Sequence, residues 1–516
     1  MSLQRAAMEQ NHGGEEESCF TSEAKRQLRL AWPLVVGCLL QKLIQMISIM
    51  FAGHLGEVAL ASASLATSFA GVTGFSLLTG MASSLDTLCG QAFGAEQHHL
   101  LGVYKQRAMV VLALVSVPVA IVWAYTDKIL VVLFFRQEDT AEIAAGAGSY
   151  TRWMIPALFL FGQLQCHVRF LQAQNVVVPV MLSSGATVLV HVPVCWVLVR
   201  SQQLGLGVNG AALANAFSNL FNLSFLALYV RLSPSCKPTW TGFSRQAFRG
   251  IPGFFKLAMP SALMVCMEWW SFEILVLLSG LLPNPKLETA VLSICFNTYS
   301  FAFSVPMGLG AAASIRVSNE LGAGRVQAAR IATRVVMLLA FSLGISEGLV
   351  MLLARKLLGY AFSNVEEVVL YTARMMPILA VCFLFDSVQC VLSGVVRGCG
   401  KQKIGAFINL VAYYIVGTPA ASIFAFIGHL KGVGLLFGIL CGLVVHLLLL
   451  LTITLCANWN KEALKANDRV PHRTASPIEM RTSGSIKQED GCASVATDNT
   501  HGTIEATKGP FDPSKS

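Results

Sequence analysis

Charged residues are scarce in this sequence. Asp, Glu, Lys and Arg make up 13% of its 516 residues, whereas hydrophobic residues make up 54% and the mean hydropathy is +0.62. A soluble globular domain carries roughly 25% charged residues. The scarcity of charge therefore excludes an ordinary soluble domain and predicts an all-α polytopic membrane protein.

Also lacking are the residue patterns of disulfide frameworks, metal centres and hydrolytic sites. The 14 cysteines are scattered, mostly in apolar runs, and none forms a CxxC pair. Cysteines in that setting behave as small core residues. Since no metal-ligand or nucleophile–base pair falls within the apolar runs, we expect no metal, no cofactor and no enzymatic activity. The net charge of +9 comes from basic residues in short loops, so we expect no nucleic-acid partner.

About twelve apolar runs follow one another along the chain, each long enough for a membrane-spanning helix, which needs ~20 residues. Basic residues concentrate in alternate loops, including those at 231–256, 316–334 and 397–403. Because such loops stay on the cytoplasmic side of a membrane, both termini are predicted to be cytoplasmic.

The chain repeats itself at an offset of about 227 residues. LAWP at 30–33 recurs as LAMP at 257–260, and GQAFGA at 90–95 matches SNELGA at 318–323. Each repeat contains six predicted spans. Because six is an even number, both halves have the same orientation and form parallel repeats.

This repeat predicts the domain organisation. Two six-helix lobes, 25–231 and 252–457, are joined by a cytoplasmic linker at 232–251 and face each other across a central cleft. That is the usual architecture for alternating access. The polar ends, 1–24 and 458–516, are predicted to be disordered cytoplasmic tails.

The seventh span, 257–280, carries two acids and a proline. A charged carboxylate at the centre of a bilayer costs at least ~2.5–3.5 kcal/mol, so such a group faces water, takes up a proton or binds a cation. Glu268 lies about 12 Å along the helix from Pro260, which weakens the helix there. We predict that Glu268 is the proton-coupling group and that Pro260 lets the helix bend. Glu273 lies about 140° around the helix from Glu268, so we expect it to have a structural partner such as a hydroxyl.

Other polar and aromatic residues in apolar runs are candidates for the same network or for contact with a solute. Asp386 is a second acid at membrane depth, and two acids that face one cleft would share protons. The candidates for solute contact are Trp269, Tyr299, Asn409, Tyr413, Gln45 and Gln163. Single polar residues also hold transmembrane helices together, and aromatic residues also pack between helices, so both roles stay open.

Five motifs resemble the plant branch of the MATE family (multidrug and toxic compound extrusion, or detoxification, proteins). They are LCGQAFGA at 88–95, PSALMVCMEWW at 260–270, LPNPKLET at 282–289, RVSNELGAG at 316–324 and VVRGCGKQ at 395–402. The resemblance covers about residues 25–460. It implies a V-shaped pair of six-helix lobes that exports organic solutes against an inward flux of cations, usually protons in plants.

The resemblance also implies roles for individual residues. The family's essential acids fall on Glu268 and Asp386, and its polar network in the eighth span falls on Asn297. The acid that microbial relatives carry in the first span is not matched, because Ser48 stands in the corresponding stretch at 45–53. The resemblance therefore gives no cation site in the first lobe.

The predicted function is secondary active antiport. Organic cations, alkaloids, flavonoids or other xenobiotics leave the cytoplasm in exchange for protons, by alternating access with protonation of Glu268. The expected partners are a small organic solute, protons and the lipid bilayer, and we expect a monomer in the plasma or vacuolar membrane. An alternative is a flippase for lipid-linked or amphipathic substrates, which would show more basic residues lining the cleft. A channel would need neither a titrating acid nor a helix that bends.

Overall fold

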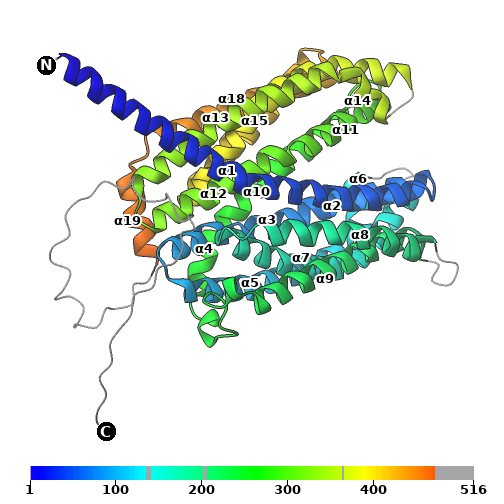
Figure 1. The fold of residues 1–516 in the computed structure, drawn as a ribbon. Coiled ribbons are helices and arrows are strands. Elements are labelled where there is room, and N and C mark those ends of the chain that lie inside the picture. Colours follow the sequence, from blue (N-terminus) through cyan, green and yellow to red (C-terminus); the bar gives the residue numbers. More distant parts are fainter. Residues whose placement is uncertain (1, 135–140, 201–205, 363–364, 471–516) are drawn as a thin grey trace, which may run out of the picture. The chain divides into compact units, whose positions relative to one another are not determined.

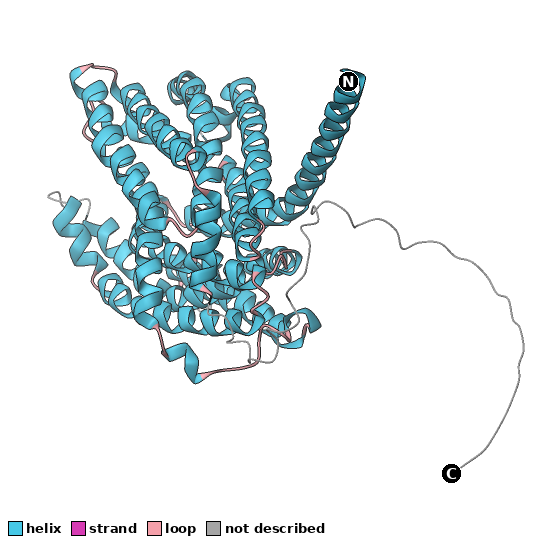
Figure 2. Ribbon diagram, turned by 90° about the vertical axis from the view of Figure 1, so that its left-hand side faces the viewer, coloured by secondary structure: helices cyan, strands magenta, loops and turns pink. Residues whose placement is uncertain are grey.

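The computed structural model describes residues 2–134, 141–200, 206–362 and 365–470. These residues form helices and connecting turns without a strand (Figure 2). Phe20–Pro471 forms one compact unit. The prediction of an all-α chain is confirmed.

Within the described ranges, 12 helices are long and apolar enough to cross a membrane, as the sequence predicts. The first six are α1 (Ser2–Gly53, with Phe20–Gly53 as the candidate span), Glu57–Gly94, α5 (His98–Ala124), α7 (Ala141–Ala173), α8 (Val178–Arg200) and α9 (Gly207–Leu232). The second six are α10 (Ile251–Ser279), Pro285–Gly322, α13 (Val326–Leu353), α15 (Glu366–Gly398), Gln402–Ile427 and α18 (Lys431–Leu455).

Three of these spans consist of several consecutive elements. The second contains α2 (Glu57–Ala70), the π-helical η1 (Gly71–Phe75), α3 (Ser76–Ala82) and α4 (Ser84–Gly94). The eighth contains α11 (Pro285–Ala302) and α12 (Ser304–Gly322). The eleventh contains α16 (Gln402–Asn409), the π-helical η5 (Leu410–Gly417), α17 (Thr418–Ser422) and the π-helical η6 (Ile423–Ile427). π-Helical turns are frequent at functional sites, because they redirect the side chains of a helix.

The two halves of the chain form two six-helix lobes. In the first lobe α9 packs between α7 and α8, and α2 packs on α7. In the second lobe α15 packs on α12, α13 and α18 (Figure 1). The segment 233–250 connects the lobes, since α9 ends at Leu232 and α10 begins at Ile251.

The first and seventh spans each pack against the opposite lobe near their beginning. Leu30 and Leu34 of α1 belong to a hydrophobic cluster with residues of α12 and α13. Phe254 and Ala258 of α10 belong to the hydrophobic cluster of the first lobe. One helix of each lobe therefore packs against the opposite lobe.

Two glycines let these crossing helices come close. A Cβ atom at Gly80 of α3 would lie 2.6 Å from the Cα of Ala262, and one at Gly308 of α12 would lie 2.7 Å from the backbone nitrogen of Val35. The two glycines occupy equivalent places in the two repeats. Such close backbone approach requires a residue without a side chain.

The lobes also meet where the loops rich in Lys and Arg lie, which we call the basic end. There α4 packs on α12. A side chain on Gly94 would collide with the carbonyl oxygen of Asn319, and one on Gly322 with that of Gln91. The lobes are thus in direct backbone contact at this end.

A buried ion cluster joins α1 to the second lobe at the same end. Arg316 of α12 donates to Glu23 of α1 at 2.9 Å and to Glu320 at 2.6 Å. Glu320 also pairs with Arg325 at 2.5 Å. The Arg316 side chain is 3% exposed and that of Arg325 is 63% exposed, so only the first of these cations is buried.

The prediction of a disordered tail at 1–24 is wrong, because α1 is helical from Ser2. The ion pair between Glu23 and Arg316 fixes the end of this segment on the second lobe.

The prediction of disorder from residue 458 is wrong for α19 (Trp459–Arg469), an amphipathic helix that packs on α12, α13 and α4. The Asn458 side chain accepts a hydrogen bond from the backbone of Lys461 at 3.1 Å and so caps the helix. Arg469 donates to Gln91 of the first lobe at 3.3 Å and to the Cys399 carbonyl of the second lobe at 3.1 Å. The rest of the predicted tail, 471–516, lies outside the described residues.

Gly308→Ala tests the close approach of α1 and α12. The added methyl group would overlap the backbone of Val35, so we expect the free energy of unfolding to fall by about 1–3 kcal/mol. The control is Gly37→Ala, since no atom lies within 4 Å of a Cβ there. Thermal unfolding in detergent should show a lower midpoint for the first variant and an unchanged or higher midpoint for the second. Equal midpoints would contradict the close packing.

Arg316→Gln and Arg325→Gln test the ion cluster. Loss of Arg316 leaves Glu23 without its cation and Glu320 with the exposed Arg325 alone, which we expect to cost about 3–5 kcal/mol. Loss of Arg325 removes an exposed partner and should cost about 0.2–1 kcal/mol. Denaturation midpoints of the two purified variants would reveal the difference, and a larger loss for Arg325→Gln would refute the assignment.

Candidate functional site

Glu268 of α10 and Asp386 of α15 share one hydrogen-bond donor. The side-chain amide of Gln389 donates to Asp386 Oδ1 and, at 3.4 Å, to Glu268 Oε1. Ser393 donates to Gln389 Oε1 at 3.3 Å. Asp386, Gln389 and Ser393 are spaced three and four positions apart, which places them on one face of α15. The structure therefore brings together the two acids that the sequence singles out.

Tyr299 of α11 gives Asp386 a second donor. Its hydroxyl donates to Asp386 Oδ2, and both side chains are buried. Glu268 is only half-buried. Asp386 is thus the shielded acid of the pair, and Glu268 is the acid that can be reached from outside.

The eleventh span holds the part of α10 that carries Glu268. Asn409 of α16 donates to the carbonyl of Met264 at 2.6 Å, and Tyr414 of η5 donates to the carbonyl of Met267 at 3.1 Å. Each carbonyl lies within one helical turn before Glu268. These bonds fix the backbone of α10 against the second lobe just beyond its crossing with the first.

Tyr413 lies between the acids and α18. Its hydroxyl makes a 3.1 Å hydrogen bond with His446 Nδ1, and both side chains are buried. Tyr413 also interacts electrostatically with Glu268 and Asp386. The π-helical geometry of η5 lets the adjacent Tyr413 and Tyr414 both bond inside the lobe.

Glu273 bonds across the lobes. Ser68 of α2 donates to Glu273 Oε2 at 2.6 Å, which is the hydroxyl partner expected from the sequence. One turn earlier, Trp270 donates to the carbonyl of Val72 in η1 at 2.8 Å. Glu273 therefore belongs to the contact between lobes and not to the pair of acids.

The remaining sequence candidates form no hydrogen bond with the two acids in the described part of the chain. Asn297 is exposed and donates to the carbonyl of Ser293 in its own helix at 2.9 Å. Gln163 donates to the carbonyl of Met109 within the first lobe at 3.1 Å. Gln45 and Trp269 are both exposed.

Ser48, which replaces an acid in the first span, has a neutral partner. It makes a 3.0 Å hydrogen bond with Nε2 of His191, whose Nδ1 bonds to Ser218 at 2.7 Å. This link joins α1, α8 and α9, so its position serves helix packing in the first lobe.

The sequence candidates did not include Gln389, although it connects the two acids. The sequence contains a pattern that could have identified Gln389, since an amide three positions after an acid in an apolar helix lies on the same face as that acid. Only the position of α10 shows that the same amide also reaches Glu268.

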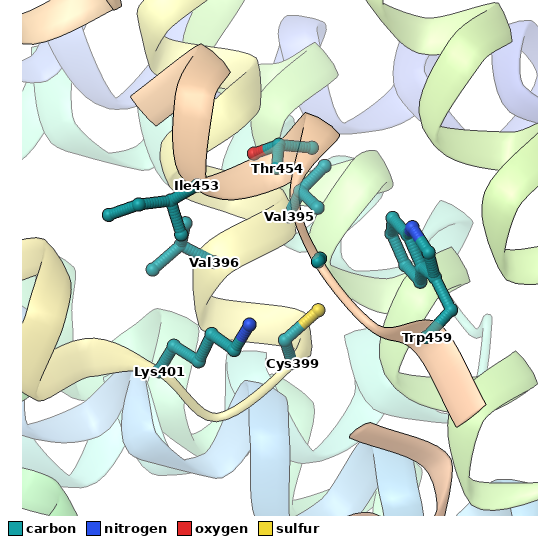
Figure 3. A pocket seen from close by; sticks show the side chains of 8 residues that line it. Val395, Val396, Cys399, Lys401, Ile453, Thr454 and Trp459 are labelled. Carbon is teal, nitrogen blue, oxygen red and sulfur yellow. The ribbon is translucent and has the colours of Figure 1, made fainter. Parts of the chain in front are cut away.

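Two cavities lie near these elements. A pocket of about 450 Å³ is lined by Thr73 of η1 and by apolar residues of α3, α5 and α10, among them Met259, Cys266 and Trp270. Cys266 lies about 160° around α10 from Glu268, so this pocket does not face the acids. The second, near Cys399, Lys401 and Trp459 (Figure 3), has a volume of about 10 Å³ and holds at most one water molecule.

Comparison with known proteins agrees with this architecture. A family model described as MatE matches residues 33–197 and 260–423, one range in each lobe. Protein DETOXIFICATION 16 of Arabidopsis thaliana is 55% identical over 455 residues, which cover 88% of this chain and 92% of that protein. The crystal structure of the eukaryotic MATE transporter AtDTX14 is 44% identical, covers 88% of this chain and 100% of that one, and has a TM-score of 0.84. A mutant of the Vibrio cholerae MATE transporter VcmN, 16% identical with a TM-score of 0.76 over 86% of this chain and 100% of that one, shares the fold.

Tyr299→Phe tests the second donor to Asp386. A buried carboxyl group loses a hydrogen bond, which should lower the free energy of unfolding by about 1.5–3 kcal/mol. Tyr414→Phe is the matched control, because it removes a hydrogen bond to a neutral carbonyl and should cost about 0.5–1.5 kcal/mol. Thermal unfolding of both variants in detergent measures the difference. A smaller loss for Tyr299→Phe would show that Asp386 does not depend on this hydroxyl.

Proposed function

This chain belongs to the MATE family of membrane transporters, and on that basis we propose that it is a proton-coupled antiporter with Glu268 as its coupling group. The observation that carries the proposal is the shared donor Gln389, which ties Glu268 of α10 to Asp386 of α15. Ionisable groups inside transmembrane segments usually mark ion or substrate pathways. The exported compounds are small organic solutes, among them organic cations, alkaloids, flavonoids or other xenobiotics.

The pair of acids binds and releases the coupling proton. Two carboxylates at short range repel each other, so they titrate as a pair and favour a state with one proton between them. A carboxyl group that gains a proton becomes a donor as well as an acceptor. The Gln389 amide then faces a neutral carboxyl group, which is a weaker acceptor than a carboxylate, and the contact between α10 and α15 changes. Glu268 exchanges the proton, because it is half-buried while Asp386 is shielded by Tyr299.

α10 carries this change to the contact between the lobes. Its first part packs in the core of the first lobe through Phe254 and Ala258, whereas Glu268 bonds to the second lobe. Pro260 lies between these two parts and removes a backbone hydrogen bond, so the helix bends there at low cost. A different bend at Pro260 alters how the lobes fit together.

Exchange follows from competition at Glu268. A cationic group of a solute binds better to the ionised carboxylate, and a proton removes that charge. We place the basic end in the cytoplasm, with both termini on that side, because loops rich in Lys and Arg stay there. The protein works as a monomer in the plasma or vacuolar membrane, with protons as the coupling ion.

Glu268→Gln tests the coupling role, with solute uptake into proteoliposomes driven by an imposed pH gradient. Glutamine keeps the shape and hydrogen bonds of glutamate but cannot exchange a proton, so we expect at least a tenfold loss of gradient-driven exchange, equivalent to about 1.4 kcal/mol. Asp386→Asn should cause a similar loss, because the two acids titrate as a pair.

Glu273→Gln is the matched control, since the amide can still bond to Ser68. It should keep most of the exchange. Full gradient-driven exchange by Glu268→Gln would refute the proposal, and a loss in all three variants would point to general damage.

A further inference from the structure

Lys42 is a charged residue near the middle of the apolar part of α1. At 1.5 Å per residue it lies about 18 Å from Leu30 and about 16 Å from Gly53, too far for its side chain to reach either end of the span. The repeat offset of about 227 residues puts Gln41 at the place equivalent to Glu268. The first lobe thus carries a cation beside the position where the second lobe carries its acid.

Lys42 has no anion of its own. It is half-buried, and within the described part of the chain it makes no hydrogen bond and no ion pair. Its electrostatic neighbour is the Cys38 thiol one turn earlier. An ammonium group at this depth is costly unless it is paired or meets water or a ligand.

The face of α1 that carries Lys42 is directed at the other lobe. Cys38, Lys42 and the exposed Gln45 are spaced four and three positions apart and so share this face. Val35, two turns before Lys42 and on the same face, lies against Gly308 of α12, whereas Leu40, on the opposite face, lies against Gly185 of α8. Lys42 therefore lies on the side of α1 that is directed at the second lobe, which carries the two acids.

Two cations of neighbouring helices differ from Lys42 in their setting. Arg169 pairs with the buried Asp86 at 3.2 Å. Arg397 lies eight positions after Gln389, about 12 Å further along α15 toward the basic end. Lys42 lies at membrane depth without an ion pair among the described residues and is free to bind an anion from outside the protein.

We infer that Lys42 binds an acidic group of the transported solute, so that the preferred solutes carry a carboxylate or a similar anionic group on an apolar body. This inference names the solute class for the antiport proposed above and rests on that proposal. A solute that also has a basic group binds to groups of both lobes. Its basic group competes with the proton at Glu268, and its acidic group pairs with Lys42. A lipid phosphate is not the anion, since it lies at the membrane surface and Lys42 lies far from it.

The test compares a fluorescent rhodamine that has a free carboxylate with its methyl ester, the same dye without the acid. Binding to the purified protein is followed by fluorescence polarisation. The wild type should bind the acid roughly 10- to 100-fold more tightly than the ester. Lys42→Met should lose this preference, whereas Lys42→Arg and the control Lys403→Met, at an exposed position in the first turn of α16, should retain it.

A second measurement separates a binding role from a structural one. Lys42→Met should unfold at the same temperature as the wild type or higher, because it removes an unpaired, half-buried charge. Equal affinity for both dyes, binding of neither, or an unchanged preference in Lys42→Met would overturn the inference. The antiport proposal can fail on its own. In that case Glu268→Gln keeps full gradient-driven exchange, while the wild type still prefers the acid dye to its ester.

Discussion

Gln389 has one side-chain amide for two carboxyl groups, and the centre of the second lobe is arranged around that shared donor. It joins α10 to α15 through Glu268 and Asp386. Low dielectric surroundings strengthen a hydrogen bond and make a missing one costly, so a proton gained by either acid affects both acids and Gln389. The neighbouring donors come from α11, α16 and η5, which means that four spans meet at this pair of acids.

α1 and α10 each pack against the opposite lobe, so both helices connect the region of the acids with both lobes. α10 has its first part in the core of the first lobe and its acid in the second. Gly80 and Gly308 bring helices of opposite lobes into backbone contact at equivalent places of the repeat. Packed interiors switch between discrete arrangements and do not deform smoothly. In the antiport that we propose, a bend at Pro260 changes the fit between the lobes, including the basic end, where α19 bonds to both lobes.

The repeat is symmetric in its backbone and asymmetric in its chemistry. The second lobe has two acids bonded to Gln389, whereas the equivalent part of the first lobe has Lys42 and the neutral link between Ser48 and His191. The solutes that we infer carry groups that complement the opposite charges of the two sides. In the antiport that we propose, the proton chemistry belongs to the second lobe alone.

Local information in the sequence determined the spans, the repeat and the two acids, because apolar length, residue spacing and a charge within an apolar run can be recognised without knowing the fold. The tertiary structure alone decided which groups meet. The bond from Gln389 to Glu268 joins residues 121 positions apart, Ser68 and Glu273 are 205 apart, and Gln91 and Arg469 are 378 apart. Asn297 and Asn409 both stand in apolar runs, yet Asn297 is exposed, whereas Asn409 is buried and bonds to the backbone of α10. The direction of a side chain depends on how its helix is rotated and packed, and spacing along one helix cannot supply that rotation relative to another.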